Sequence, residues 1–404
     1  MMKTGLLGRK LGHSYSPQIH AHLGDYRYEL FEIEPDDVGT FLMTGDFDAI
    51  NVTIPYKQDV IAYCSELSDA AKRIGAVNTI IRRPDGSLIG HNTDYFGFLS
   101  TLERSGLNFN GKKAVIIGNG GASKPVKAAL DDLGADTVVI SHKDNTPDNL
   151  AFHADAAILV NATPVGMHPN NGISPVNLDL FPHLEGVFDL IYNPSRTKLM
   201  LDAKQRGLLV INGLWMLVAQ AKESSEWFTG SAISNRVIEP IYQALSRQME
   251  NVVLIGMPGS GKSTIGRALA ERLGREFVDA DTEITKAAGM TIPNIFALSG
   301  ESGFRQIETK VLNDLGKKSG LVISTGGGCV TQERNYPLLH QNSKIFCLNR
   351  NLEQLPTDGR PLSQKGNLEE MYRIRKPMYD HFADYIIDNN GDLNETVSQI
   401  ISKL

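Results

Sequence analysis

One glycine-rich segment carries the residue types that bind the phosphates of a nucleotide. Residues 256–263 read G-M-P-G-S-G-K-S and match the pattern G-x-x-x-x-G-K-[ST] at every fixed position. In such a loop backbone N–H groups face phosphate oxygens, the lysine reaches the β- and γ-phosphates, and the last serine ligates Mg²⁺. We therefore predict that the nucleotide contacts Gly256, Gly259, Ser260, Gly261, Lys262, Ser263 and Thr264.

Two carboxylates follow this loop. Asp279 and Asp281 come after a short apolar strand, and alternation along a strand would point both at one cleft. One carboxylate, which we assign to Asp279 with Ser263, would hold Mg²⁺, and the other would accept hydrogen bonds from an acceptor hydroxyl. A solvated acidic loop is the alternative reading of the same residues.

Glycines and arginines further along suggest the rest of an anion site. Residues 326–328 are three glycines, which favour close approach of a ligand to the backbone over a plain turn. Arg305, Arg360 and Arg375 have the planar donors that carboxylate and phosphate accept. Taken singly, each of these arginines would more often lie on the surface.

The N-terminal half holds weaker signals when each is read alone. Ser14 and Ser16 can present two hydroxyls to one anion, although an S-x-S turn is usually only a turn. Lys57 follows an apolar strand and a proline, and a lone lysine is usually a solvated surface group. Asp94 lies in a polar turn at a predicted helix start, where aspartate is also an ordinary N-cap.

Two junctions of strand, glycine turn and helix must position these residues. The first runs from a strand at 114–117 to a helix at 123–133, and the second from a strand at 252–255 to a helix at 264–273. Each is a candidate nucleotide site. A helical pattern over 231–248 separates them without a flexible linker, so we place the domain boundary near residue 248.

Length and composition limit the classes of protein that fit. A chain of 404 residues predicts two or three domains of about 150 residues. Hydrophobic residues at 41% and charged residues at 21% are typical of globular proteins, and no apolar run approaches the ~20 residues of a membrane span. The three cysteines have no short spacing, so the sequence indicates no disulfide framework. The net charge of −6 gives no sign of a surface that binds nucleic acid. We expect a cytoplasmic protein.

Residues 250–404 resemble shikimate kinase in their motifs. The matches are the phosphate loop, D-A-D at 279–281, G-F-R-Q-I-E at 303–308, T-G-G-G at 325–328, R-P-L at 360–362 and R-K-P-M-Y at 375–379. The resemblance implies an α/β fold of the nucleoside-monophosphate-kinase type with MgATP as phosphate donor. It also implies that shikimate is bound by Asp281, Arg305, Gly327 and Arg375. Arg360 would meet the transferring phosphate, and the segment before it, 349–360, is shorter than in the family.

Residues 1–248 resemble shikimate dehydrogenase. The matches are H-S-Y-S-P at 13–17, N-V-T-I-P-Y-K at 51–57, G-A-V-N-T at 75–79, H-N-T-D at 91–94, G-N-G-G-A-S at 118–123, N-A-T-P-V-G-M at 161–167 and M-L-V-A-Q at 216–220. The resemblance implies an α/β substrate domain over residues 1–100, completed by 210–248, and a Rossmann-like cofactor domain over 101–209. The third domain, 249–404, would be the kinase.

The same resemblance assigns roles in the first half. Lys57 and Asp94 would be the catalytic pair, as Lys262 and Arg360 would be in the second half. The substrate would be held by Ser14, Ser16, Thr53, Asn78, Asn92, Tyr192 and Gln220. The dinucleotide would contact Gly118, Gly120, Gly121, Ala122, Thr163, Gly213 and Met216.

Cofactor choice departs from the family pattern. After the strand at 137–140, where NADP-using members generally carry an arginine, this chain reads Ser141-His142-Lys143. No aspartate or glutamate for the ribose of NAD stands at the strand end. We predict that Ser141, His142 and Lys143 hold the 2′-phosphate of NADP. The segment 144–154 is shorter than in the family.

The sequence therefore predicts a bifunctional enzyme of the shikimate pathway with NADP(H), ATP and Mg²⁺ as cofactors. Its partners would be 3-dehydroshikimate and shikimate, without nucleic acid or membrane, and its oligomeric state is left open. One alternative is an NAD-preferring quinate/shikimate dehydrogenase fused to the kinase. Another is that one half is a catalytically silent ligand sensor.

Overall fold

A computed structural model describes residues 1–12, 14–355 and 368–404. The described chain forms two compact units. Unit 1 comprises the ranges 1–165, 174–192 and 202–244, and unit 2 comprises 166–173, 193–201 and 245–404. The division of the first half into a substrate domain and a cofactor domain stays a prediction. Each unit is described by itself below.

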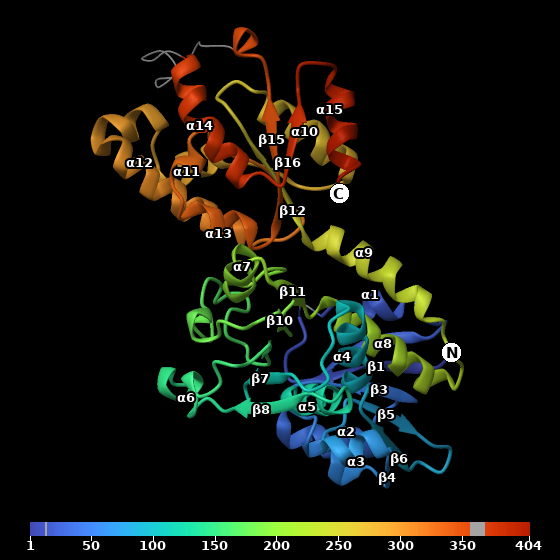
Figure 1. Ribbon diagram of the computed structural model, residues 1–404. Coiled ribbons are helices and arrows are strands. Elements are labelled where there is room, and N and C mark those ends of the chain that lie inside the picture. The colour runs from blue at the N-terminus through green and yellow to red at the C-terminus, as the bar shows by residue number, and fades with distance from the viewer. Residues whose placement is uncertain (13, 356–367) are drawn as a thin grey trace. The chain divides into compact units, whose positions relative to one another are not determined.

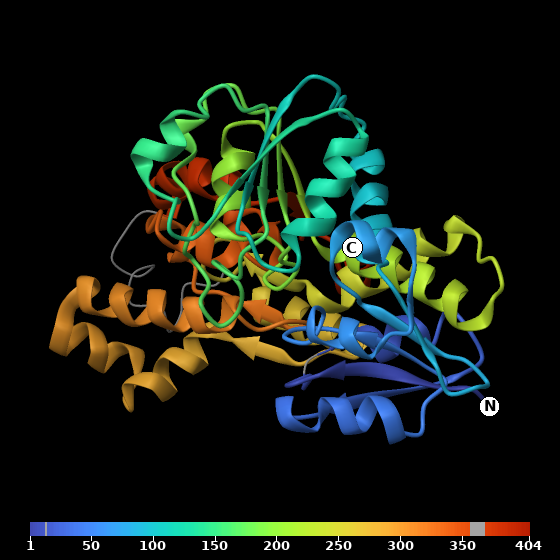
Figure 2. The same ribbon diagram turned by 90° about the horizontal axis from the view of Figure 1, so that it is seen from below.

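Unit 1 contains a mixed sheet in the order β2-β1-β3-β5-β6-β4. Its strands are β1 (Lys3–Gly8), β2 (Arg27–Glu32), β3 (Ala49–Val52), β4 (Glu66–Leu67), β5 (Thr79–Arg82) and β6 (Leu88–His91). β1 pairs in parallel with β2 and β3, and these blue strands lie side by side in both views (Figure 1; Figure 2). The helices in this region are α1 (Ser16–His20), α2 (Val38–Thr44) and α3 (Asp69–Ile74).

The second sheet of unit 1 is entirely parallel, in the order β11-β10-β9-β7-β8. Its strands are β7 (Lys113–Ile117), β8 (Asp136–Ile140), β9 (Ile158–Asn161), β10 (Gly186–Asp189) and β11 (Leu209–Asn212). Val115 and Ile116 are adjacent in β7 and both fully buried, as expected for a parallel sheet that is covered on both faces. The predicted junction is confirmed, because β7 leads through the glycine turn into α5 (Ser123–Asp132).

The other helices of this half are α4 (Asp94–Ser105), α6 (Pro147–Ala151), α7 (Lys198–Gln205), α8 (Leu214–Thr229) and α9 (Ile238–Met249). α4 and α8 pack closely because Gly97 has no side chain. A Cβ at Gly97 would lie 2.7 Å from the carbonyl oxygen of Met216 and 2.9 Å from Cβ of Gln220. This contact fixes Gln220 against the start of α4. α6 has only five residues and lies in the segment 144–154 that the sequence predicts to be short.

Unit 2 contains a parallel sheet in the order β13-β14-β12-β15-β16 (Figure 1). Its strands are β12 (Asn251–Ile255), β13 (Phe277–Asp279), β14 (Val322–Ser324), β15 (Ser343–Asn349) and β16 (Tyr385–Asp388). Its helices are α10 (Lys262–Leu273), α11 (Ala280–Ala288), α12 (Ile292–Gly316, kinked at Gly300), α13 (Asn335–His340), α14 (Leu368–Phe382) and α15 (Leu393–Ile401). The carboxyl ends of β14, β12 and β15 meet at one edge, where parallel sheets bind ligands.

Unit 2 also includes two short segments from the first half of the sequence. Arg196 pairs with Glu250 at 2.6 Å and donates to the carbonyl oxygen of His340 at 3.1 Å. The side chain of Asn171 donates to that of Gln341 at 2.7 Å. Across the described ranges of both units, no helix is long and apolar enough to cross a membrane.

Candidate functional site

The phosphate loop of unit 2 joins β12 to α10, as the sequence predicts. Gly261 precedes the helix with φ +91, a conformation that favours glycine. Lys262 is 8% exposed, and its Nζ donates to the carbonyl oxygens of Gly256 at 3.0 Å and Met257 at 2.9 Å. The side chain of Asn389 donates to the carbonyl oxygen of Ser260 at 2.7 Å and so ties the loop to the end of β16. Hydrogen bonds within unit 2 therefore fix the conformation of the phosphate loop.

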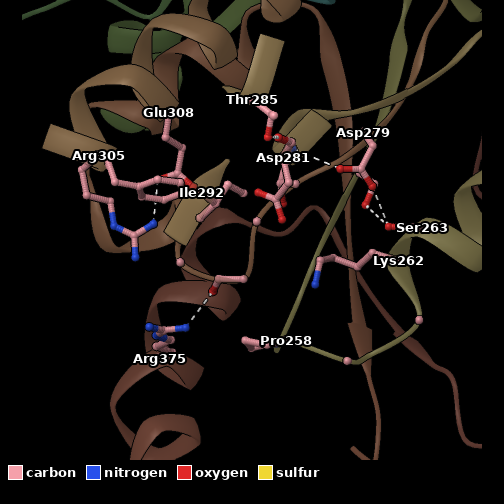
Figure 3. A pocket seen from close by; sticks show the side chains of 18 of the residues that line it. Pro258, Lys262, Ser263, Asp279, Asp281, Thr285, Ile292, Arg305, Glu308 and Arg375 are labelled. Carbon is pink, nitrogen blue, oxygen red and sulfur yellow. Dashed lines mark hydrogen bonds and ion pairs between the residues drawn. The ribbon is translucent and has the colours of Figure 1, made fainter. Parts of the chain in front are cut away.

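The two carboxylates face the same cavity, but the predicted reason is wrong. Asp279 ends β13 and caps α11, its side chain accepting from the backbone N–H groups of Asp281 and Thr282. Asp281 therefore lies in the first turn of a helix and does not alternate along a strand. Ser263 Oγ donates to Asp279 Oδ2 at 2.7 Å, so a hydroxyl and a carboxylate oxygen lie together (Figure 3).

Asp281 is placed to accept a proton. Its Oδ1 is buried and has no hydrogen-bond partner. Burial, and then the nearby charge of Asp279, raise the pKa of Asp281 above the usual value. A carboxylate with a raised pKa is a stronger general base near neutral pH than an ordinary aspartate.

The three glycines after β14 allow protein side chains to approach the backbone. A Cβ at Gly326 would lie 2.9 Å from Asp281 Oδ1, and one at Gly328 would lie 2.2 Å from Arg305 Nη2. A Cβ at Gly327 would lie 2.7 Å from Cδ of Pro258 in the phosphate loop. The sequence predicted close approach of a ligand, and the structure adds these side chains as a sufficient reason for the glycines.

Arg305 and Arg375, two of the described arginines at this edge, are held differently. Arg305 is 4% exposed and pairs with Glu308 at 2.7 Å and with Glu301 at 3.0 Å. Burial raises the pKa of Glu308, and the charge of Arg305 opposes that shift. Arg375 on α14 donates to the carbonyl oxygen of Gly327 at 3.2 Å. Sequence reasoning gave no role to Glu308, although it stands three residues after Arg305 and hence on the same helical face.

These side chains line one cavity of about 700 Å³ (Figure 3). Its polar lining contains Lys262, Ser263, Asp279, Asp281, Arg305 and Arg375. Ile292, Phe296 and Phe304 form an apolar wall. Arg360 lies outside the described residues. The cavity combines a phosphate loop with several carboxylates and arginines, a set suited to transferring a phosphoryl group to a small anionic acceptor.

In unit 1, the predicted catalytic pair is in contact. Lys57 Nζ donates to Asp94 Oδ2 at 2.6 Å, and the two side chains are 17% and 10% exposed. Asp94 is the first residue of α4 and comes after the N-cap position, so the alternative reading as an N-cap is wrong. A mostly buried ammonium beside a carboxylate is a positioned proton donor.

A buried polar network lies behind this pair. Asn78 Oδ1 accepts from the backbone N–H of Thr93 at 2.7 Å, and Thr93 Oγ1 donates to Gln220 Oε1 at 3.3 Å. Ser224 is fully buried, one helical turn after Gln220, and its hydroxyl contacts that of Thr93 at 3.0 Å. Asn92 is fully buried and bonded to backbone groups. Thr93 and Ser224 were missed, although Ser224 stands at i+4 from Gln220 and Thr93 stands between Asn92 and Asp94 in the sequence.

The remaining predicted substrate residues lie in unit 1 with fewer polar contacts. Ser14 Oγ accepts from the backbone N–H of Ser16 at 3.2 Å at the start of α1. Tyr15 and Tyr192 meet edge to face at 6.2 Å, and burial raises the pKa of Tyr192. Thr53 is half-buried at the end of β3. Their contact with substrate stays a prediction.

The glycine turn between β7 and α5 leaves room for a ligand before the start of the helix. Gly118 has φ +105, and a Cβ there would lie 2.8 Å from Cγ2 of Thr163. Cβ atoms at Gly120 and Gly121 would meet nothing within 4 Å, so space lies above the turn, and Ala122 is the N-cap residue of α5.

Two other predicted cofactor residues have packing roles. Gly213 allows close packing, because a Cβ there would lie 2.0 Å from the carbonyl oxygen of Leu190. Met216 is buried in the core beside α4. Binding of a cofactor by these residues stays a prediction.

The segment after β8 presents two exposed basic side chains, His142 and Lys143. The hydroxyl of Ser141 donates to the carboxylate of Asp144. Ser141 would have to exchange that bond to contact a phosphate. In the described parts of the chain, no group of three or more histidine, cysteine or acidic side chains is arranged to hold a metal.

Comparison with known proteins identifies both halves. The sequence model of the shikimate kinase family matches residues 258–404, and that of the shikimate dehydrogenase substrate binding domain matches residues 6–80. Shikimate dehydrogenase (NADP(+)) of Clostridium beijerinckii is 35% identical over 267 residues, covering 61% of this chain and 98% of that protein.

Solved structures similar to the first part of this chain are also shikimate dehydrogenases. Shikimate dehydrogenase 1 of Peptoclostridium difficile is 39% identical with a TM-score of 0.56, over 61% of this chain and 98% of its own. The enzyme of Thermus thermophilus in complex with NADP(H) and shikimate is 31% identical with a TM-score of 0.55, over 60% and 99%. The chain therefore belongs to the shikimate dehydrogenase family and carries a shikimate kinase domain at its C-terminus.

Proposed function

We propose that this enzyme reduces 3-dehydroshikimate to shikimate with NADPH and phosphorylates the 3-hydroxyl of shikimate with MgATP. The observation that carries the proposal is the presence of two separate sets of reacting groups among the described residues. Lys57 and Asp94 form one set, and the phosphate loop with Asp281 and Arg305 forms the other. The product of the first reaction is the acceptor of the second.

In the reduction, the nicotinamide supplies a hydride when it is bound. Lys57 donates a proton to the substrate oxygen as the ketone becomes an alcohol, and its positive charge stabilises the developing oxyanion. Asp94, at 2.6 Å from Nζ, holds the ammonium in place. Gln220, fixed by Thr93 and by the packing at Gly97, orients a substrate hydroxyl.

In the phosphorylation, Mg²⁺ neutralises phosphate charge when it is bound. Ser263 and Asp279 supply oxygen ligands of the kind Mg²⁺ prefers. Asp281 accepts the proton of the 3-hydroxyl, while Arg305 and Arg375 bind the substrate carboxylate. Lys262 leaves the carbonyl oxygens of the loop and binds the β- and γ-phosphates.

NADP is the cofactor we propose for the first reaction. Space above Gly120 and Gly121, the N-terminus of α5 and the exposed His142 and Lys143 after β8 support binding of a phosphorylated dinucleotide. The names of the relatives specify NADP as well. A comparison of kcat/KM for NADPH and NADH, with quinate as an added substrate, separates this proposal from the quinate enzyme.

The test is a product analysis by mass spectrometry. The full chain is mixed with 3-dehydroshikimate, NADPH and MgATP, and each cofactor is omitted in turn. We expect shikimate 3-phosphate only in the complete mixture and shikimate when ATP is absent. Lys57→Ala should remove the reduction alone and Lys262→Ala the phosphorylation alone. If wild-type protein binds shikimate without turnover, the sensor alternative is correct.

A further inference from the structure

Arg350 lies beside the phosphate loop and has no role in the reactions described above. It follows β15 directly and lines the large cavity. It also lines a second cavity of about 210 Å³. Its Nη1 lies 3.9 Å from the position that a Cβ on Gly261 would occupy. A guanidinium therefore reaches the residue that precedes α10.

The charge of Arg350 has no described carboxylate beside it. Its Nε is buried without a hydrogen-bond partner, and among the described residues no carboxylate pairs with it. Two other arginines of the same unit do pair with a carboxylate: Arg305 with Glu308, and Arg373 with Glu370. A guanidinium is always charged and carries five donors, so an unpaired one beside a phosphate loop is suited to an anionic ligand.

The sheet order indicates which part of the ligand Arg350 faces. β14 lies on one side of β12 and leads to the glycines that contact Asp281 and Arg305, the acceptor side. β15 lies on the other side of β12 and leads to Arg350. The phosphate that transfers must lie toward the acceptor. Arg350 therefore approaches the loop from the side of the phosphates that stay with the nucleoside.

We propose that Arg350 binds oxygens of the α- or β-phosphate of the nucleotide. The inference rests on the proposed kinase function. These phosphates are present in both substrate and product nucleotide, so the contact stabilises ground state and transition state alike. Its loss should therefore raise KM for MgATP and Kd for MgADP together and leave kcat nearly unchanged.

The experiment compares Arg350→Gln and Arg350→Lys with a control, Arg373→Gln, in the full chain. Arg373 is an exposed arginine that pairs with Glu370. For Arg350→Gln we expect Kd for MgADP and KM for MgATP to rise about 10- to 100-fold, the range for a lost charged hydrogen bond. Arg350→Lys should recover part of the affinity. The control, KM for shikimate and the reduction should be unchanged.

Adenosine binding separates a phosphate contact from a contact with the base. We expect Arg350→Gln to leave adenosine affinity unchanged. The inference is overturned if MgADP binds the variant as it binds wild type, if adenosine binding weakens equally, or if kcat falls without a change in KM. MgADP affinity is measured without turnover, so failure of wild-type protein to phosphorylate shikimate would contradict the proposed function and leave this test valid.

Discussion

Replacing Gly328 by alanine would displace Arg305, the arginine that we place on the substrate carboxylate. The new Cβ would lie 2.2 Å from Nη2 and 2.7 Å from Cζ of that side chain. Unbonded heavy atoms normally stay about 3.5 Å apart. The guanidinium must therefore move by about 1 Å. Because it is buried and paired with Glu308 at 2.7 Å, that movement disrupts the ion pair.

A displacement of about 1 Å in a group that positions substrate can reduce turnover by ~100-fold. For Gly328→Ala we expect kcat/KM for shikimate to fall by about 30- to 100-fold. KM for MgATP and the dehydrogenase activity should change less than about twofold, because neither site involves Arg305. ADP release is measured against shikimate concentration at saturating MgATP. A fall of less than about threefold in kcat/KM would refute the reasoning.

Three further predictions concern charge. Asp279→Asn should raise the Mg²⁺ concentration for half-maximal kinase activity by about tenfold or more, measured by Mg²⁺ titration. Because the pKa of Asp281 is raised and its ionised form accepts the proton, kcat/KM should fall as the pH drops through a value above the ordinary 3.8, and Asp279→Asn should shift that limb of the pH profile downward. Burial lowers the pKa of His20 from 6.5 to about 3, so only the unfolded chain binds its proton between these values. Stability should fall by up to about 1.4 kcal/mol per pH unit below 6.5, and urea titrations of His20→Phe should lack that contribution.

Features fixed by neighbouring residues could be predicted from the sequence. The phosphate loop is contiguous, so its strand, turn and helix followed from one segment, and α10 begins at Lys262 within that motif. The sequence correctly predicted that Asp279 and Asp281 face one cavity, but it predicted that both lie on a strand. The strand instead ends at Asp279, which caps α11, and the alternation of side chains along a strand cannot predict where that strand ends.

Features that depend on distant parts of the chain could not be predicted. Thr93 and Ser224 contact each other across 131 positions, and only the packing of α4 on α8 brings them together. Glu308 was visible beside Arg305 in the sequence, but its burial depends on the whole of unit 2. Arg350 has no motif, because its proximity to Gly261 comes from the pairing of β15 with β12.

Lys262 donates to two carbonyl oxygens of its own loop in this structure. When a nucleotide binds, its phosphate oxygens replace these carbonyls as acceptors for Lys262. The contribution of Lys262 to the binding free energy is therefore the difference between two hydrogen-bonded states. An ion that offers too few oxygens to replace those carbonyls gains little by entering. The loop should accordingly discriminate against chloride, which offers Lys262 no oxygen, and favour the polyphosphate chain of a nucleotide, whose oxygens can replace both carbonyls.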